Sequence, residues 1–249
     1  MSKSVTLDGQ ILHGRDRYGS WRINSMEGWS ETPEPKTNGE PRPSANGDYD
    51  AEVYYGPRLV TINGRLIAKT PGDAFMARQH LTSLLRKPGK FSVDQFNQIQ
   101  HAVARRGRIQ PGNIVGRWLT FQMEIRFIGP QKFGEERIFV AKPNESVAAF
   151  HQGNHPASPV ATVAGSFPGG YTLTLAGLSV VVTEPLTSSA PHTVDFAKGR
   201  LYKNGAVVRG GMSTAMLGKV EPFQRDAFSI SPNTTGNGTA TLSIFDTFM

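Results

Sequence analysis

Strict alternation of apolar and polar residues between Trp118 and Phe127 constrains the fold more than any other feature of this sequence. The apolar residues stand at the odd positions: Leu119, Phe121, Met123, Ile125 and Phe127. Period two places alternate side chains on opposite faces of a strand. A shift of the strand pairing by one residue would expose all five apolar side chains to water, so we expect a strand whose register is firmly set.

The stretch before it predicts a strand followed by a helix. Apolar residues or glycine recur at the even positions from Val60 to Ala68. Asn63-Gly64 is compatible with a tight hairpin turn or with a kink inside one strand. We favour the kink, because the apolar phase continues across it. Thr70 can then cap a helix over about residues 70–87, which Pro88-Gly89 ends.

The rest of the chain consists mainly of short strand patterns. In the first half, Val5 to Ile11 predicts one strand, Arg137 to Ala141 another, and Glu135-Glu136 a solvated turn. In the second half, the apolar phase changes at Ala176-Gly177, and Asn204-Gly205 stands between two short strands, so both pairs predict hairpins. Several such strands indicate a sandwich or jelly roll.

Composition narrows the classes of function. The chain has no cysteine, which excludes disulfides and Cys-ligated metals, and its 27 Gly and 17 Pro suit a turn-rich β protein. The net charge of +7 would suit a polyanionic partner, but an ordinary basic protein is the preferred interpretation, because no Lys/Arg cluster dominates. No apolar run approaches the length of a signal core or a membrane span, so we expect a soluble protein made in a cytoplasm.

No motif of catalysis or cofactor binding is recognisable. Gly165 to Gly169 has its serine one place too early for a nucleophile elbow. His151 and His155 have zinc-like spacing, but Gly153 and Pro156 disfavour a helix there and no third ligand is apparent. We therefore expect no enzyme, no metal and no cofactor.

Several segments together resemble the distal tail proteins (Dit) of long non-contractile-tailed bacteriophages. The similarity lies in Tyr55-Gly-Pro-Arg58, Val60 to Ile67, Ala102 to Ile109 and Met123 to Pro130, in this order and spacing. It covers the first half of the chain and, more loosely, the second, where Asp195 precedes the Asn204-Gly205 hairpin.

This resemblance implies a mainly β fold in two parts. An N-terminal β-sandwich-like domain with one α-helix would span residues 1–135, and a C-terminal galectin-like or jelly-roll β-sandwich would span 136–249, with the boundary placed to within about 15 residues. The N-terminal domain would build a homohexameric ring at the tail tip of the virion, assembled in the bacterial host cytoplasm. The ring would join the tail tube protein to the hub or tail fibre protein, and DNA would pass through its lumen without specific binding.

Five residues are candidates for contacts between subunits or with partners: Arg58, Arg105, Arg106, Arg108 and Trp118. The arginines could instead form a solvated strand edge that resists unwanted pairing. Trp118 stands on the polar side of its strand, where it could belong to a second core layer, a subunit contact or a ligand platform.

Two further expectations concern less regular features. Residues Ser30 to Asp50 are rich in Pro, Gly, Asn and Glu, which predicts a long loop that is mobile unless a neighbour orders it. The alternative function is a carbohydrate-binding module for host cell-wall polysaccharide, although the second half contains no tryptophan. Nucleic-acid binding is a third hypothesis that no recognised motif supports.

Overall fold

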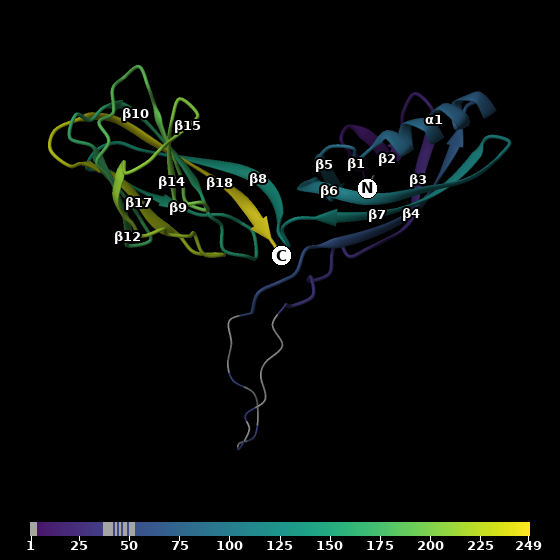
Figure 1. Cartoon of the computed structure of the whole chain (residues 1–249), viewed down its shortest axis with the longest axis horizontal. Helices are drawn as coiled ribbons and strands as arrows, with labels where there is room; N and C mark the ends of the chain where they lie inside the picture. Colours follow the sequence, from purple (N-terminus) through teal and green to yellow (C-terminus); the bar gives the residue numbers. More distant parts are fainter. Residues whose placement is uncertain (1–3, 37–41, 43, 45, 47–48, 50–52) are drawn as a thin grey trace. The chain divides into compact units, whose positions relative to one another are not determined.

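The computed structural model describes residues 4–36, 42, 44, 46, 49 and 53–249 (Figure 1). The chain forms two compact units: unit 1 consists of residues 1–132 with Met249, and unit 2 of residues 133–248. The predicted domains, a ring-forming β domain at 1–135 and a galectin-like sandwich at 136–249, stay a prediction. Much of the predicted loop from Ser30 to Asp50 lies outside the described residues.

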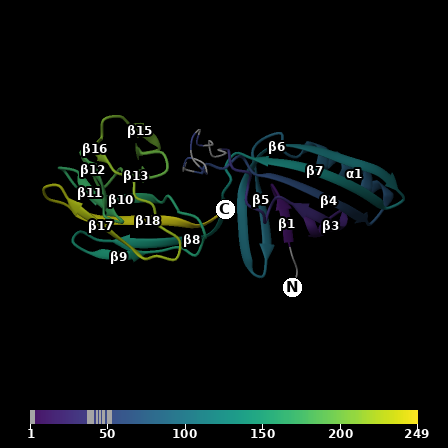
Figure 2. The same cartoon turned by 90° about the horizontal axis from the view of Figure 1, so that it is seen from below.

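Unit 1 is a sheet whose first and last strands pair with each other. Its strands are β1 (Ser4–Leu7), β2 (Gln10–Arg15), β3 (Gly19–Glu27), β4 (Leu59–Ala68), β5 (Gly89–Gln95), β6 (Gln98–Val115) and β7 (Trp118–Phe127). Their order is β6-β5-β1-β2-β3-β4-β7, and β7 pairs again with β6, so that the sheet curls around one core (Figure 2). Pairing along the whole circuit leaves few backbone groups of these strands at an edge.

The alternation in β7 determines which side chains fill this core. Its five apolar residues at odd positions are at most 3% exposed, whereas Trp118 and Glu124 on the other face are exposed. β4 runs unbroken through Asn63-Gly64, so the pair lies inside one strand and forms no hairpin turn. A Cβ at position 64 would lie 2.4 Å from Cζ of Phe121, so the close approach of this ring requires glycine.

The helix α1 (Pro71–Ser83) packs against β4, β6 and β7. The Thr70 hydroxyl accepts a 3.1 Å hydrogen bond from the backbone N–H of Asp73, as expected for an N-cap. The buried residues Ala74, Ala77 and Leu81 face the sheet. The helix ends at Ser83 rather than near 87, because Leu84 is already extended and Leu85 has a φ of 59°.

Unit 2 contains two antiparallel sheets. One has the order β15 (Ala206–Val208), β14 (Arg200–Lys203), β13 (His192–Asp195), β10 (Val160–Ser166), β18 (Asn237–Phe248) and β8 (Lys132–Ala141). The other has the order β16 (Met212–Ala215), β12 (Leu178–Val182), β11 (Tyr171–Leu175), β17 (Asp226–Pro232) and β9 (Ser146–Ala149). A single apolar cluster, with Phe167, Leu173, Phe228 and Leu242 among its members, forms the core.

The predicted hairpins of unit 2 are confirmed. Ala176 and Gly177 have positive φ between β11 and β12, and Asn204 and Gly205 have positive φ between β14 and β15. The alternation of β18 is confirmed as well, with Ala240, Leu242 and Ile244 fully buried. Two strands, β9 and β16, were not predicted, because four residues with mixed polarity give no periodic signal.

Two predictions for the ends of strands are wrong. The segment Val5 to Ile11 is not one strand: Asp8 and Gly9 have positive φ and form a turn between β1 and β2. Glu135-Glu136 is not a turn, because both residues lie within β8, where Ser243 donates a hydrogen bond to Glu136. The mainly β fold class, with one α-helix among the described residues, is confirmed.

Candidate interaction surface

Arg58 lies inside unit 1, where it binds four backbone carbonyls. Its Nε donates to Pro130 O at 3.0 Å, and its Nη1 donates to the carbonyls of Gly28, Trp29 and Glu31 at 2.7, 3.0 and 2.7 Å. The residue is 1% exposed. Its hydrogen bonds connect the segment after β3 with the segment after β7. Burial lowers the pKa of Arg58, while the Glu31 carboxylate acts in the opposite direction. Its predicted role as a subunit contact is untested, but its side chain is already engaged within its own chain.

Lys132 lies beside this arginine and was not identified from the sequence. Its Nζ donates to Trp29 O at 3.0 Å and lies 5.7 Å from the centre of the Trp29 ring. Burial, reinforced by the positive charge of Arg58, lowers the pKa of Lys132 to about 8. Two buried cations thus share one carbonyl oxygen, an arrangement that the sequence gives no signal for, because the partners are far apart in the chain.

Three exposed arginines lie on the outer surface of β6 and β7: Arg105 and Arg108 on β6, and Arg126 on β7. The backbone of Arg106 pairs opposite Arg126, and the side chain of Arg106 lies outside the described part of the structure. The register shifts between Ala104 and Arg106, so Arg105 is the extra residue of a β-bulge. We call Arg105, Arg108 and Arg126 the arginine face.

Two shallow cavities mark this face. The first, of 430 Å³, is lined by Lys36, Pro57, Arg105, Arg126, Phe127 and Ile128. The second, of 320 Å³, lies beside it and includes Arg108, Arg126 and the exposed carboxylate of Glu124. Neither Arg105, Arg108 nor Arg126 forms a salt bridge with any described residue. Arg105 and Arg108 are among the candidates predicted from the sequence, whereas Arg126 is not, because its place beside them depends on the pairing of β6 with β7.

Trp118 lies at the opposite end of β7 from Arg126. It is 47% exposed, and the guanidinium of Arg65 lies 5.6 Å from its ring centre. Val115, opposite it on β6, is 71% exposed. Trp21 and Trp29, by contrast, are buried in the core of unit 1. Trp118 is therefore not part of that core, and the subunit contact and the ligand platform stay open as predictions.

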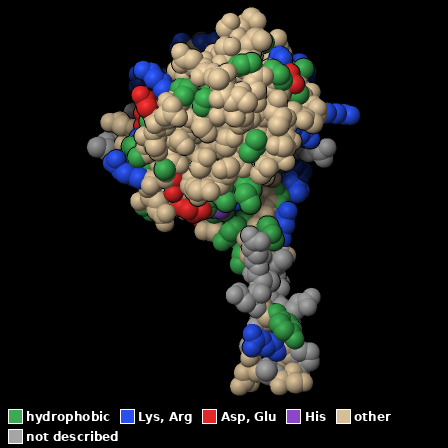
Figure 3. All heavy atoms as spheres, turned by 90° about the vertical axis from the view of Figure 1, so that its left-hand side faces the viewer, with side chains coloured by type: hydrophobic (Ala, Val, Ile, Leu, Met, Phe, Trp, Pro, Cys, Tyr) green, Lys and Arg blue, Asp and Glu red, His purple; other side chains and the backbone are tan. Residues whose placement is uncertain are grey.

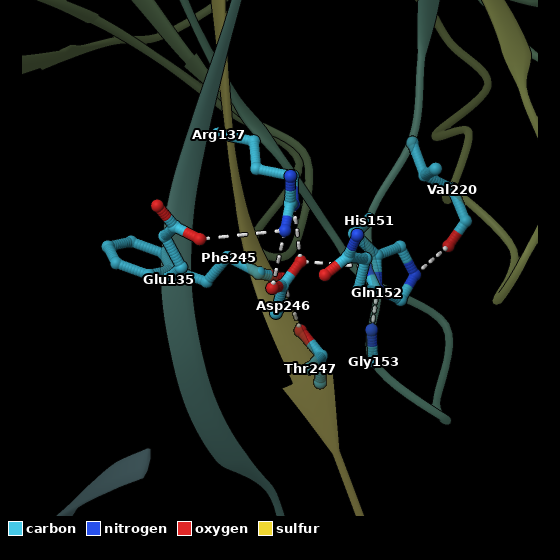
Figure 4. A network of polar contacts seen from close by, with 9 residues as sticks. All are labelled: Glu135, Arg137, His151, Gln152, Gly153, Val220, Phe245, Asp246 and Thr247. Atoms are coloured by element: carbon cyan, nitrogen blue, oxygen red, sulfur yellow. Dashed lines mark hydrogen bonds and ion pairs between the residues drawn. The ribbon is translucent and has the colours of Figure 1, made fainter. Parts of the chain in front are cut away.

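Unit 2 contains a polar network that holds its segments together (Figure 4). Asp246 on β18 accepts hydrogen bonds from Arg137 Nε at 2.7 Å and from the backbone N–H of Gln152 at 2.7 Å. His151 Nδ1 accepts from Gly153 N–H, and its Nε2 faces Val220 O at 3.1 Å. Both nitrogens of this histidine are thus occupied by the backbone, which assigns it a structural role.

Other classes of site find little support in the described part of the chain. No group of three or more His, Cys, Asp or Glu side chains there could hold a metal ion. None of the helices described is long and apolar enough to cross a membrane. Figure 3 shows a face of unit 2 on which uncharged polar side chains and backbone predominate. Nothing on this face tests the carbohydrate-binding alternative, which stays a prediction.

The curled sheet with its helix, followed by the two-sheet unit, defines the fold class of this protein. No protein-family profile and no curated protein sequence matches the sequence of this chain. Among solved structures, the Dit protein of phage SPP1, described as a paradigm of the hub adsorption apparatus in phages that infect Gram-positive bacteria, is similar over 100% of both chains, with a TM-score of 0.74 and 14% identity.

The baseplate of phage P2 in its activated conformation gives two weaker similarities. With calcium, the TM-score is 0.52 at 6% identity over 98% of each chain; with strontium, it is 0.52 at 5% identity over 97% of each. This chain therefore has the fold of the SPP1 Dit protein throughout its length. The resemblance noted in the sequence is confirmed at the level of the fold.

Proposed function

We propose that this protein is a structural component of a phage tail tip, where it forms a hexameric ring. The ring joins the tail tube to the hub or the tail fibre, and DNA crosses its lumen without specific binding. The observation that carries the proposal is the similarity to the SPP1 Dit protein over the full length of both chains. A match of both units in one order is more specific than a match of one sandwich would be.

The surface of unit 1 supports a role in assembly. Its strands pair in a closed circuit, so contacts with other subunits must be made mainly through side chains on the outer face of the sheet. That face bears exposed arginines at one end of β7 and the half-exposed Trp118 at the other. Arginine and tryptophan are enriched in protein interfaces relative to the rest of the protein surface. Assembly through such surfaces requires shape and charge complementarity and no bond-making chemistry.

The mass of the particle in solution tests the proposal. We expect light scattering at about 100 µM to give six times the monomer mass of 27.1 kDa, because the proposed ring contains six copies and head-to-tail contacts that close on themselves end at a fixed number of subunits. Electron micrographs of the same sample should show six-fold rings with a central hole. A protein that stays a monomer at this concentration, at both low and physiological salt, contradicts the ring. A lower mass with closed symmetry would contradict the hexamer alone.

A further inference from the structure

Strand β6 has an exposed apolar patch at each of its ends. At its start, Phe96 in the turn from β5 is 67% exposed and Ile99 is 57% exposed; we call these two residues the tip patch. At its end, Val115 is 71% exposed, and its partner on β7, Trp118, is 47% exposed. β6 is 18 residues long, so about 50 Å of extended strand separates the two patches within one copy.

The turn that carries Phe96 is strained. β5 and β6 are joined by the two-residue loop Phe96-Asn97, which follows Gln95 and precedes its pairing partner Gln98. Both loop residues have positive φ, 56° and 62°. Two such residues in a two-residue hairpin loop form a type I′ turn, which favours Asn, Asp or Gly and disfavours bulky side chains. The chain thus holds an aromatic ring in water at a costly backbone position, and strain of this kind clusters at functional sites.

The patch at the other end of β6 is a row across three strands. Ile67 on β4 and Val115 on β6 both pair directly with Trp118 on β7, so the three side chains lie on one face of the sheet. We call these three residues the sheet patch. The guanidinium of Arg65 lies 5.6 Å from the centre of the Trp118 ring, and Arg117 in the adjoining turn is exposed. The sheet patch therefore has two positive charges beside it.

The two patches are complementary in charge as well as in polarity. Asp94 pairs directly with Ile99 across the β5–β6 hairpin, so its carboxylate lies on the same face as the tip patch. Neither Asp94, Arg65 nor Arg117 forms a salt bridge with another residue that the structure describes. Contact between a tip patch and a sheet patch brings opposite charges together, whereas contact between two tip patches brings two carboxylates together.

We infer that the tip patch of one copy binds the sheet patch of the next copy. This inference rests on the proposed ring and names a contact that closes it. The two patches differ and are held apart by β6, so the contact is head-to-tail and uses each patch of a copy once. It buries the rings of Phe96 and Trp118, and aromatic residues are enriched at the centres of protein interfaces.

One variant in each patch tests the contact. Phe96→Asn removes the ring of the tip patch and leaves a residue that a type I′ turn favours. Trp118→Thr removes the ring of the sheet patch and leaves a residue that suits a strand. We expect each variant alone to lower the association constant at least about tenfold. Each should therefore stay a monomer near the concentration at which the wild type begins to form rings.

An equimolar mixture of the two variants distinguishes a head-to-tail contact from other arrangements. Only one productive contact remains in the mixture, between the intact tip patch of Trp118→Thr and the intact sheet patch of Phe96→Asn. We therefore expect light scattering to give twice the monomer mass of 27.1 kDa and no larger particle.

A matched control is Phe75→Gln, which removes an aromatic ring that is 53% exposed on α1, outside both patches. This control should assemble as the wild type does. Tryptophan fluorescence establishes that every variant is folded, because Trp21 and Trp29 remain in the core of unit 1 even in Trp118→Thr.

The possible results separate the inference from the proposed ring. If the wild type forms rings and both variants form them equally well, the inference is wrong and the ring stands. If both variants are monomers and their mixture gives no dimer, the two patches do not bind each other and the inference is wrong. If the wild type forms no ring and the mixture gives no dimer, both the inference and the proposed ring are wrong.

Discussion

Lys132 donates a hydrogen bond of 3.0 Å to the main-chain oxygen of Trp29, 103 residues earlier in the chain, and Arg58 donates to the same oxygen at the same distance. Two cations at one acceptor repel each other, and burial removes the water that would screen them. Burial and this repulsion lower the pKa of Lys132 to about 8. The arrangement fixes the backbone after β3 at the cost of keeping a charged lysine inside unit 1.

The low pKa of Lys132 predicts how stability depends on pH. Between about pH 8 and 10.5 the unfolded chain keeps the lysine proton that the folded chain has lost, so the free energy of unfolding rises with pH in this window. Below about pH 8 the folded chain carries the charged lysine in full, so the loss of stability caused by burying this charge is at its maximum. We expect Lys132→Met to remove this rise in urea titrations followed by tryptophan fluorescence. Lys87→Met, at an exposed position, should keep it. An unchanged pH dependence in Lys132→Met would show that the lysine is not the group responsible.

Replacement of Arg58 by alanine should destabilise unit 1 strongly. Arg58→Ala leaves four carbonyls, those of Gly28, Trp29, Glu31 and Pro130, without this donor. We expect a loss of about 3 kcal/mol in the free energy of unfolding, part of it offset because Lys132 loses a repulsive neighbour. Urea titration at fixed protein concentration measures it. Arg86→Ala, at an exposed position, is the control and should change stability by less than about 0.5 kcal/mol.

The acid stability of unit 2 should depend on Asp246. Burial acts to raise the pKa of Asp246, but the hydrogen bonds from Arg137 and from Gln152 N–H outweigh it, so the pKa lies below its ordinary value. Such a carboxylate stabilises the fold above about pH 4, and this contribution disappears as the pH falls through the lower folded value. Asp246→Asn should lower the free energy of unfolding by about 2 kcal/mol at neutral pH. It should also weaken the decrease of this free energy as the pH falls below about 4.

The stability of unit 2 at acid pH is measured by hydrogen exchange of peptides from β8 and β18. Tryptophan fluorescence is not suitable here, because unit 2 contains no tryptophan. Glu145→Gln removes an exposed carboxylate of the same unit and serves as the control. Equal acid profiles for the wild type and Asp246→Asn would contradict the assigned role of the pair with Arg137.

The close contacts at Gly64 in β4 predict a specific steric effect. In Gly64→Ala, the new methyl group would lie 2.4 Å from Phe121 Cζ and 2.9 Å from the backbone oxygen of Arg22. We expect a loss of about 2 kcal/mol in the free energy of unfolding. In Gly64→Ala/Phe121→Leu, the smaller side chain should recover part of the loss relative to Phe121→Leu alone. A double variant whose losses simply add would locate the strain at the backbone of Arg22 instead.

Much of the fold follows from local sequence. The alternation in β7 and β18, the cap at Thr70 and the turn at Asn204-Gly205 depend only on residues a few positions apart, so the sequence reveals them. The turn at Asp8-Gly9 lies between two short strands and was missed, because the apolar pattern of Val5 to Ile11 looks like one strand.

The candidate surface was only partly predictable. The sequence places Arg105, Arg106 and Arg108 together because they are neighbours, and it shows that Trp118 stands on the polar side of β7. It does not distinguish the exposed Arg105 in β6 from the buried Arg58 directly before β4, since no local pattern around either residue reveals its burial. It also does not show that Arg126 joins the other arginines across the β6–β7 pair.

By itself, the sequence determined many of the strands with their buried faces, the start of the helix and the hairpin turns of unit 2, because these depend on side-chain period and backbone preference within a few residues. Only the tertiary structure decided that β6 closes on β7, that Arg58 binds a carbonyl 72 positions away, and that Lys132 shares an acceptor with it. Contacts over such separations depend on the path of the whole chain in space, and no local pattern encodes that path.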